Sequence, residues 1–512
     1  MADSKVVRDY RIPWYGAAIF LSSAVVMVLE ISAGRLIAPY VGVSLYTWTA
    51  IIGVVLAGLS LGNWLGGRWA DQGGNERAVG ITLMVAGLFS LFSLLVLTIV
   101  APFLKASTLD LVSSSFLYAL TMFLAPAVLL GVITPLLTTL ALQLDVRSGH
   151  VVGRMHALAA LGSIVGTFLT GYVLIQYIGT RNVIVATSAL LFVLALPFFR
   201  NGSRWAPLSL ALGATLLAVI VYARAGFANP CDRESNYFCL RVVDTSADAP
   251  FGTAKALILD HLIHGINHES EPGMMISPYV HLMDELVLRQ FPEDRVAPIK
   301  FFFAGGGAYT QPRAVQALYP EAAITVAELD PAVTDMVAQS LYVQTEGMEI
   351  IHQDARAVLH HLSHRQFDVV IIDAFHDIAI PYHLLTREFV QLVRSRLAGD
   401  GLLATNVVDA FPDARLVKSL VNTLATEFRY VDVWVDTLPD RDTRLTYVIA
   451  ASNSKQHPDM LQAQRGFDRT WYRINEPLRT TGTSPASLPA FTDDLVPVER
   501  LMAKLLFSKQ GR

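Results

Sequence analysis

The fold of the C-terminal half is decided by residues 299–309, which read Ile299-Lys300-Phe301-Phe302-Phe303-Ala304-Gly305-Gly306-Gly307-Ala308-Tyr309. An apolar run this short predicts a strand that is buried on both faces of a parallel sheet. The three glycines let the chain turn tightly and bring backbone N–H groups close to a ligand. This stretch therefore predicts the first strand and loop of a nucleotide-binding type of sheet, and a plain turn is the competing interpretation.

Three further short apolar runs each end near an acidic residue. The first of these acids follows the glycines by about 20 residues, a place where a carboxylate can accept hydrogen bonds from ribose hydroxyls. Because the carboxyl ends of parallel strands meet at one edge of a doubly wound sheet, we expect all of these acids to lie at a common ligand site. They are Glu328 and Asp330 after residues 323–327, Asp354 after residues 348–352, and Asp373 after residues 367–372.

Together these pieces resemble the aminopropyltransferase (spermidine synthase) family, a branch of the class I S-adenosylmethionine-dependent methyltransferase fold. The resemblance covers about residues 232–500 and includes Glu234-Ser235-Asn236-Tyr237-Phe238, Leu259-Asp260, the glycine triplet, Glu328-Leu329-Asp330, Asp354-Ala355-Arg356, Asp373 and Thr492-Asp493-Asp494. It implies an α/β Rossmann-like domain over residues 299–512. A small β-domain with a lead-in helix is expected before it, over residues 227–298.

The resemblance also implies the roles of individual residues. The expected co-substrate is decarboxylated S-adenosylmethionine or S-adenosylmethionine, with a small amine or polyamine as acceptor and no metal. Asp373 matches the catalytic aspartate, which takes a proton from the attacking amine. The implied cofactor-binding residues are Gly305, Gly306, Gly307, Glu328, Asp330, Asp354 and Ala355. The implied substrate-binding residues are Asp260, His264, Tyr279, His376, Asp377 and Tyr382.

Several of these positions depart from the family pattern. His264 replaces a glutamine, Tyr279 is the part of a Tyr-His-Glu motif that survives, and His376 stands where a second loop acid is expected, with Asp377 shifted by one. Two other functions therefore stay open. One is a non-catalytic nucleoside or polyamine sensor or transport module, and the other is an S-adenosylmethionine-dependent methyltransferase or lyase. Asp373 as a purely structural cap is a further alternative.

The N-terminal half has a different composition. Hydrophobic residues make up 53% of the chain, charged residues 16%, and the mean hydropathy is +0.45. Residues 12–222 contain 14 charged side chains, whereas the other 301 positions contain 68. Such a chain has a membrane part, which we expect over residues 1–226.

The apolar segments predict a bundle of seven transmembrane helices, with the lipid bilayer as their partner. They run from Trp14 to about Ile37 and over residues 44–66, 79–101, 113–142, 155–178, 182–199 and 206–223. The first is expected to be a retained span rather than a removed signal peptide, because no small-residue cleavage signal follows it. The fourth contains Pro126 and Pro135, and counting it as two spans would reverse the topology.

Two further features of the predicted spans are a glycine pattern that predicts helix packing and a short motif that resembles a transporter family. Gly58, Gly62 and Gly66 recur every fourth residue, as do Gly162 and Gly166, which predicts close approach of helices. Residues 66–71, Gly-Gly-Arg-Trp-Ala-Asp, resemble the loop motif of major facilitator transporters. The N-terminal half is therefore interpreted as a transporter-like module of a multi-pass inner (cytoplasmic) membrane protein.

Basic residues set the expected orientation. One set of loops holds Lys5, Arg8, Arg11, Arg68, Arg77, Arg147, Arg154, Arg200 and Arg204, and the alternate set holds Arg35, Lys105 and Arg181. This bias predicts a cytoplasmic N-terminus and, with seven spans, an extracytoplasmic soluble half. Cys231 and Cys239 either close a small loop by a disulfide there or are two unpaired thiols.

The remaining expectations concern partners and the C-terminal segment. A net charge of −4 gives no reason to invoke nucleic acid, and a homo-oligomer stays open. One helix is expected at Pro458–Tyr472. Asp493 and Asp494 are expected to cap a final helix, Val498–Leu506, or else to close over the site.

Overall fold

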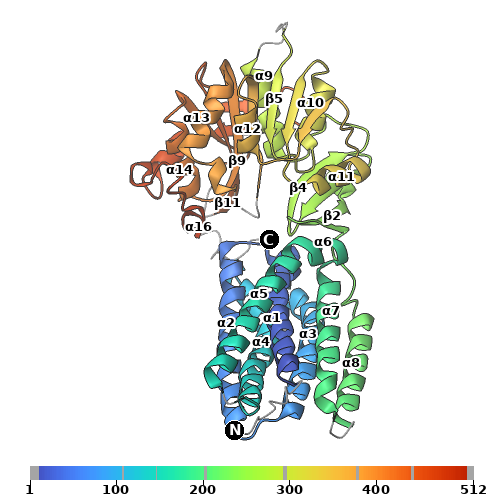
Figure 1. Ribbon diagram of the computed structural model, residues 1–512. Helices are drawn as coiled ribbons and strands as arrows, with labels where there is room; N and C mark the ends of the chain where they lie inside the picture. Colours follow the sequence, from blue (N-terminus) through green and yellow to red (C-terminus); the bar gives the residue numbers. More distant parts are fainter. Residues whose placement is uncertain are drawn as a thin grey trace, which may run out of the picture. The chain divides into compact units, whose positions relative to one another are not determined.

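The computed structural model describes residues 11–106, 109–145, 147–200, 205–291, 297–375, 380–439 and 443–503. The chain divides into two compact units, Met1–Pro230 and Cys231–Ser508. The first unit contains seven helices that are long and apolar enough to cross a membrane, which confirms the predicted number. They are α1 (Arg11–Val41), α2 (Leu45–Asp71), α3 (Glu76–Ala106), α4 (Leu111–Leu142), α5 (Ser148–Leu169) continued by η1 (Thr170–Leu174) and α6 (Ile175–Ile178), α7 (Thr180–Ala195) continued by η2 (Leu196–Phe199), and α8 (Trp205–Ala223) (Figure 1).

Local signals explain where two of these helices begin. The Ser44 hydroxyl accepts a hydrogen bond from the Thr47 amide at the start of α2, and the Asp110 carboxylate accepts one from the Ser113 amide at the start of α4. Helix α4 then runs through Pro126 and Pro135 without a break. The fourth apolar segment is therefore one helix, as predicted.

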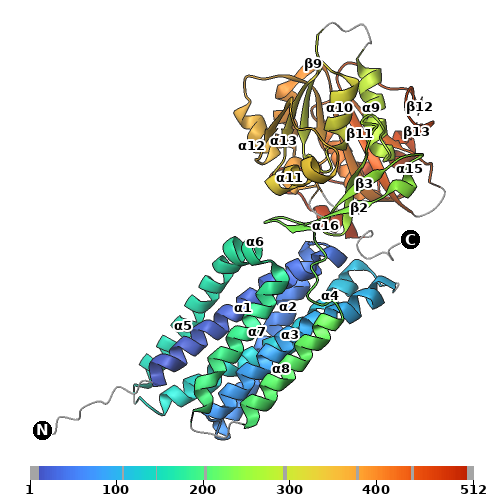
Figure 2. The same ribbon diagram turned by 90° about the vertical axis from the view of Figure 1, so that its right-hand side faces the viewer.

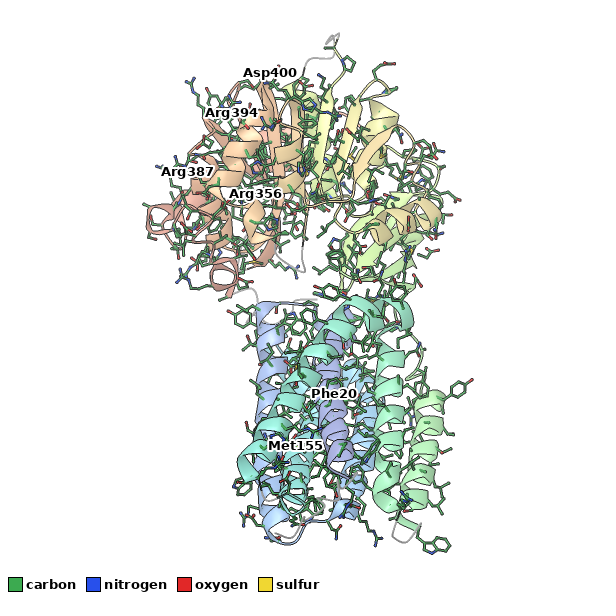
Figure 3. The ribbon with its side chains drawn as sticks, in the orientation of Figure 1. Phe20, Met155, Arg356, Arg387, Arg394 and Asp400 are labelled. Atoms are coloured by element: carbon green, nitrogen blue, oxygen red, sulfur yellow. A yellow bond between two sulfur atoms is a disulfide. The ribbon has the colours of Figure 1, made fainter. Side chains whose placement is uncertain are left out.

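Glycines set the closest helix contacts of this unit. A Cβ atom on Gly62 of α2 would lie 2.1 Å from the Val128 carbonyl oxygen of α4. A Cβ atom on Gly162 of α5 would lie 2.0 Å from the carbonyl oxygen of Phe20 on α1, which is labelled in Figure 3. Because any side chain at these positions would overlap the neighbouring backbone, the glycines act in helix packing, as the sequence predicts.

The transporter-like segment, residues 66–71, is helical rather than a loop. It forms the last turns of α2, and Gly66 packs against Val132 of α4. Its arginine, Arg68, lies over the ring of Trp64, with 4.8 Å between the guanidinium carbon and the ring centroid. The segment therefore contributes to helix packing and to one end of α2.

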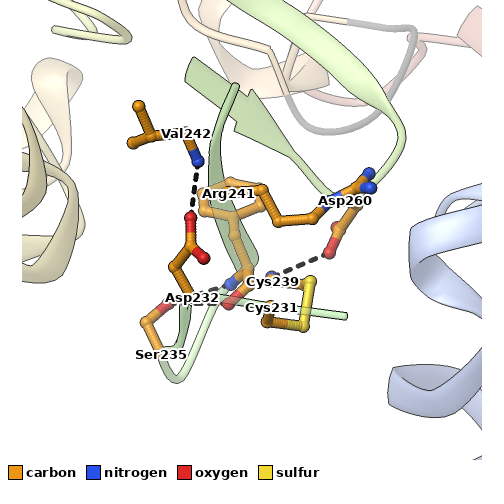
Figure 4. Close-up of a disulfide and its surroundings, with 8 residues drawn as sticks. Cys231, Asp232, Ser235, Cys239, Arg241, Val242 and Asp260 are labelled. Atoms are coloured by element: carbon orange, nitrogen blue, oxygen red, sulfur yellow. Dashed lines mark hydrogen bonds between the residues drawn. A yellow bond between two sulfur atoms is a disulfide. The ribbon is translucent and has the colours of Figure 1, made fainter. Parts of the chain in front are cut away.

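The second unit opens with a four-stranded antiparallel sheet. Its strands, in spatial order, are β1 (Arg233–Glu234), β2 (Cys239–Asp244), β3 (Ala254–Leu259) and β4 (Leu262–His268). A disulfide joins Cys231 to Cys239 and closes the loop that contains β1 (Figure 4). Of the two alternatives for this cysteine pair, the structure has the bonded one. Helix α9 (Pro278–Gln290) follows the sheet.

A nine-stranded sheet forms the centre of this unit. Its spatial order is β12-β13-β10-β11-β9-β8-β5-β6-β7, in which β5, β6, β7, β8 and β9 are parallel and the remaining neighbours are antiparallel. Its strands are β5 (Lys300–Ala304), β6 (Ala323–Ala327), β7 (Met348–Ile351), β8 (Phe367–Ile372), β9 (Leu397–Phe411), β10 (Tyr430–Val435), β11 (Thr443–Ser452), β12 (Met460–Gln462) and β13 (Thr470–Arg473). The seven strands from β10 to β7 have the order of the class I methyltransferase fold, as the sequence predicts, and β13 and β12 extend the sheet beyond β10.

The helices form two layers on this sheet (Figure 2). The chain moves outward from β5 through β6 to β7, and then returns to β8 on the other side of β5. Because such crossovers are right-handed, this reversal places the helices before and after it on opposite faces. The helices are α10 (Thr310–Leu318) and α11 (Pro331–Ser340) in one layer, and α12 (Ala355–His361), α13 (Arg387–Arg396) and α14 (Arg415–Leu424) in the other.

The core explains why residues 300–304 form a central strand. Phe301 and Phe303 stack on one face of the sheet with ring centroids 5.8 Å apart, and Phe302 contacts Phe367 on the other face. All four rings are buried. A run of consecutive large apolar residues is therefore accommodated because both faces of β5 are covered.

The C-terminal segment differs from its prediction. Residues 458–472 hold the strands β12 and β13 rather than a helix, because β13 pairs antiparallel with β10 at the sheet edge and β12 pairs antiparallel with β13. A short helix, α15 (Asn475–Thr480), follows, and α16 (Val498–Leu501) begins at Val498, where the final helix is predicted to begin.

The contact between α2 and α4 generates a prediction. Gly62→Ala places a methyl group against the backbone of α4, so the variant should lose about 1–3 kcal/mol of stability, the usual cost of overpacking. Thermal unfolding of the detergent-solubilised protein should show a lower Tm. Gly67→Ala in the same helix is the matched control, since no atom lies within 4 Å of its added Cβ. Equal Tm values for the two variants would contradict the packing role of Gly62.

Candidate functional site

The glycine loop lies at the point where the sheet reverses direction. It follows β5, and its neighbour β8 leads into Asp373. Gly305 has φ of +92°, and a Cβ atom there would lie 2.6 Å from the Asp373 carbonyl oxygen. Glycine at this position therefore allows the two loops to touch backbone to backbone. In doubly wound sheets the edge beside such a switch point is where ligands bind.

Glu328 holds this loop in place. Its carboxylate accepts hydrogen bonds from the Gly306 amide at 2.8 Å and from the Asp330 amide at 2.9 Å. Burial raises the pKa of Glu328, and the backbone N–H groups oppose that increase. A carboxylate offers about four acceptor sites, so these two bonds leave capacity for ligand hydroxyls.

The acids after β6 and β7 act as helix caps. The Asp330 carboxylate accepts a hydrogen bond from the Ala332 amide in the first turn of α11, and the Ser235 hydroxyl donates to its other oxygen. The Asp354 carboxylate caps α12, whose first residue is the buried Ala355. His383 donates to Asp354 at 2.7 Å, and this bond lowers the pKa of Asp354.

Asp373 has the surroundings of a functional carboxyl group. The Tyr279 hydroxyl donates to its Oδ2 atom across 3.4 Å. Burial raises the pKa of Asp373 to about 6, and hydrogen bonds from Asn406 and Tyr279 limit the increase. A carboxylate with a pKa in this range is ionised at neutral pH and can still accept and release a proton.

A small hollow of about 10 Å³ lies between the glycine loop and Asp373. Its lining consists of His264, Tyr279, Val280, Phe303, Gly305, Gly306, Thr310, Gln311, Pro312 and Asp373. The Thr310 hydroxyl and the side-chain carbonyl oxygen of Gln311 are buried here, and no described residue forms a hydrogen bond with either atom. Buried polar atoms rarely lack a hydrogen-bond partner, so the chemistry of these two atoms suits a polar ligand. It is too small for a nucleoside until side chains move, because ligand pockets typically measure about 300–1,000 Å³.

Tyr279 also borders a second, larger hollow of about 240 Å³. Its lining consists of Pro278, Tyr279, Leu282, Trp434, Val435, Asp436, Arg444, Leu445, Thr446, Val448 and Trp471. Two fully buried tryptophans supply apolar surface, and an acid and an arginine are exposed at its edge. The Tyr279 side chain therefore separates a space beside Asp373 from a space with both apolar and charged walls.

His264 is the residue in this site that departs most from the expected chemistry. Burial lowers the pKa of His264 to about 4, with a smaller contribution from His261. The imidazole is consequently neutral at physiological pH and contributes no charge beside Asp373. Its backbone carbonyl accepts a hydrogen bond from the Ala308 amide at 3.3 Å, which joins β4 to the glycine loop.

The structure brings together only part of the predicted substrate set. His264 and Tyr279 line the hollow beside Asp373. Asp260 lies outside both linings at a turn with φ of +53°, where its carboxylate accepts a hydrogen bond from the Cys239 amide (Figure 4). Tyr382 is 65% exposed in η4 (Tyr382–Leu384). His376 and Asp377 fall outside the described residues.

Several residues of the site were not predicted from the sequence. Thr310 and Gln311 could have been suspected, because the first turn of the helix after a glycine loop faces the ligand in this type of sheet. Asn406 of β9 and the tryptophans of the larger hollow carry no local motif, so nothing in the sequence marks them.

The prediction that Asp493 and Asp494 cap the final helix is wrong. Helix α16 is preceded by Pro497 and has no side-chain cap, so Asp493 and Asp494 do not cap it. Asp493 instead forms a bidentate pair with Arg356 of α12, at 2.7 and 2.6 Å, and this hydrogen bonding lowers the pKa of Asp493 to about 2. The pair ties the C-terminal segment to the helix that Asp354 caps.

Comparisons with known proteins agree with this architecture. Residues 295–459 match the spermine/spermidine synthase domain. The chain is 26% identical over 214 residues to a probable polyamine aminopropyl transferase of Bifidobacterium longum, covering 38% of this chain and 47% of that relative. It is 32% identical over 112 residues to a polyamine aminopropyltransferase of Vibrio vulnificus, covering 21% of this chain and 38% of that relative.

A crystal structure of a probable spermidine synthase from Corynebacterium glutamicum is similar, with a TM-score of 0.43 and 18% identity, over 52% of this chain and 96% of that one. The chain spans about half or less of the length of the two relatives matched by sequence. By these matches, residues 295–459 are similar to the spermidine synthase family, and among the described residues they follow seven long apolar helices.

Proposed function

We propose that this protein is a membrane-bound transferase that moves an aminopropyl-type group from decarboxylated S-adenosylmethionine, or a related sulfonium nucleoside, to an amine. The observation that carries the proposal is Asp373, a buried carboxyl group beside the glycine loop with its pKa raised to about 6. The matches to aminopropyltransferases support the same reaction class. When bound, the sulfonium group supplies a carbon that an amine can attack and a neutral thioether that can leave.

The residues for holding the nucleoside are those around the glycine loop. Glu328 has acceptor capacity for ribose hydroxyls beyond its two backbone bonds. Thr310 and Gln311 offer unpaired polar atoms in the same place. Asp354, whose carboxylate caps α12 and accepts from His383, and Ala355 stand at the start of α12, where they would border the purine.

Asp373 would act on the amine. As a carboxylate it accepts one N–H hydrogen bond, which aims the nitrogen lone pair, and it takes the proton as the new C–N bond forms. Tyr279 orients Asp373 through its hydroxyl and at the same time borders the larger hollow. That hollow would take the acceptor, with its aliphatic part against Trp434 and Trp471.

The decisive experiment is to incubate the purified full-length protein with decarboxylated S-adenosylmethionine or S-adenosylmethionine and a set of amines, and to identify the products by mass. An aminopropyl adduct supports the proposal. A methyl adduct, or loss of the side chain without an acceptor, would assign methyl transfer or lyase chemistry instead. Binding without any product would favour the non-catalytic sensor or transport function.

The role of Asp373 generates a prediction on rate. Asp373→Asn should keep the fold and reduce turnover by about 10²–10⁴-fold, the usual contribution of a general base. Asp400→Asn is the matched control, because Asp400 is exposed at one end of the same sheet (Figure 3). Equal turnover in wild type and the Asp373 variant would assign this residue to structure.

The raised pKa of Asp373 generates a prediction on pH. Activity should rise as the pH passes through about 6, because only the ionised carboxyl group accepts a proton. The folded state favours the protonated form, so Asp373 costs the wild type stability as the pH rises from about 4 to about 6. Unfolding temperatures of wild type and Asp373→Asn at pH 5 and pH 8 should show the variant gaining relative stability at pH 8. An unchanged difference would contradict the raised pKa.

Glu328 generates a prediction on affinity. Glu328→Ala should weaken binding of the sulfonium nucleoside by about 1–3 kcal/mol, since polar groups of the ligand and of Gly306 lose their acceptor. Calorimetry measures this change, and Glu321→Ala, an exposed acid before β6, is the control. Unchanged affinity in the Glu328 variant would refute the ribose assignment.

The side of the membrane is open to a direct test. Charge bias and an odd number of apolar helices predict an extracytoplasmic soluble unit, and the Cys231–Cys239 disulfide supports an oxidising compartment. A reporter active only in the periplasm, fused after Arg512, should therefore be active in a bacterial host. Cys231 should resist alkylation until reductant is added. A silent reporter together with freely labelled thiols would place the unit in the cytoplasm.

A further inference from the structure

A third hollow, of about 570 Å³, lies apart from Asp373, between the end of β4, one side of α10 and the loop that follows α11. Its lining consists of Glu269, Pro272, Arg313, Gln316, Ala317, Ala338, Tyr342, Val343 and Gln344. None of these residues lines the hollows beside Asp373 and Tyr279. The volume is that of a typical small-molecule site.

Arg313 is the unusual residue in this lining. It is 6% exposed, and its guanidinium donates one hydrogen bond, to the Glu269 carbonyl oxygen at 3.1 Å. Within the part of the chain that the structure describes, no carboxylate pairs with it. Burial accordingly lowers the pKa of Arg313. Taking a cation out of water without an anion costs several kcal/mol, so buried arginines are normally paired.

The other lining residues suit an oxyanion. Gln344 and Tyr342 carry neutral hydrogen-bond donors, whereas the Gln316 amide nitrogen already donates to the Glu346 carbonyl oxygen at 2.6 Å. Lys255 lies over the Tyr342 ring with its nitrogen 5.0 Å from the centroid, which adds a second cation nearby. Glu269 is the acid of the lining. Its side chain is exposed, so water screens its charge.

We propose that this hollow, which we call the Arg313 site, binds a small ligand through a carboxylate or phosphate group that pairs with Arg313. The planar guanidinium fits two oxygens of such a group at once. The site is independent of the reaction proposed above, because it lies outside the residues that surround Asp373.

The test uses the full-length protein in detergent, titrated with inorganic phosphate and separately with malonate, with chloride held at equal ionic strength in the reference. One of the two anions should raise the Tm in a saturable way, as a ligand of the folded state does. The better anion identifies the phosphate or the carboxylate class. No stabilisation beyond chloride by either anion would overturn the proposal.

Variants assign the effect to Arg313. Arg313→Met should raise the apparent Kd by about tenfold or more, since a charge-assisted bidentate contact is lost. Its Tm without anion should not fall, because an apolar side chain removes the cost of the buried charge. Arg394→Met is the control: Arg394 likewise donates to a main-chain carbonyl, that of Leu397, and is labelled on α13 in Figure 3. Equal loss of anion binding in both variants would show non-specific charge screening and overturn the proposal.

If Arg313→Met does not fold, a variant that fills the hollow provides a second test of the Arg313 site. Ala338 lies on an exposed part of α11 and lines the hollow, so Ala338→Trp fills the space and leaves Arg313 in place. The anion-dependent rise in Tm should disappear in this variant. If the rise persists at the wild-type Kd, the anion binds elsewhere and the Arg313 site is refuted.

Discussion

The carboxylate of Glu328 connects the two loops on which the rest of the candidate site depends. It accepts one N–H group from the loop after β5 and one from the loop after β6, so a single side chain fixes the spacing of adjacent strand ends. Gly305 then brings the first of these loops against the backbone of Asp373. Three strand ends are thereby joined through direct contacts, and the carboxyl group of Asp373 has a defined position relative to the glycine loop before any ligand arrives.

Much of this arrangement could be predicted from short stretches of sequence. A buried parallel strand can be recognised from its own residues, as with Phe301–Phe303. The carboxyl end of such a strand lies at the edge of the sheet where ligands bind. Glu328 and Asp373 could therefore be placed at that edge, because each comes directly after such a strand, and Asp354 follows the end of the parallel edge strand β7 by three residues. The apolar helices are equally local, because length and composition alone define them, and the glycines that recur every fourth residue showed which faces pack.

Other features depend on residues that are far apart in the chain. The Arg356–Asp493 pair joins positions 137 residues apart, and each partner alone looks like an ordinary surface charge. Strands β12 and β13 are only three and four residues long, and they are strands because β10 offers an edge to β13 and β13 in turn pairs with β12. The three hollows are likewise made by side chains from several elements. Tertiary pairing, which leaves no periodic pattern, determined each of these features.

Helix α8, described over its whole length, has one buried residue, Val221, and packs against α3, while Leu208, Leu212 and Leu216 are more than half exposed. In a bilayer, lipid tails would cover these side chains, and few protein contacts would hold the helix in place. Extraction replaces those tails with detergent, so little opposes separation of α8 from the bundle. Lipid nanodiscs, or detergents that retain bound lipid, are therefore the preparations in which the segment leading to Cys231 keeps its native anchoring.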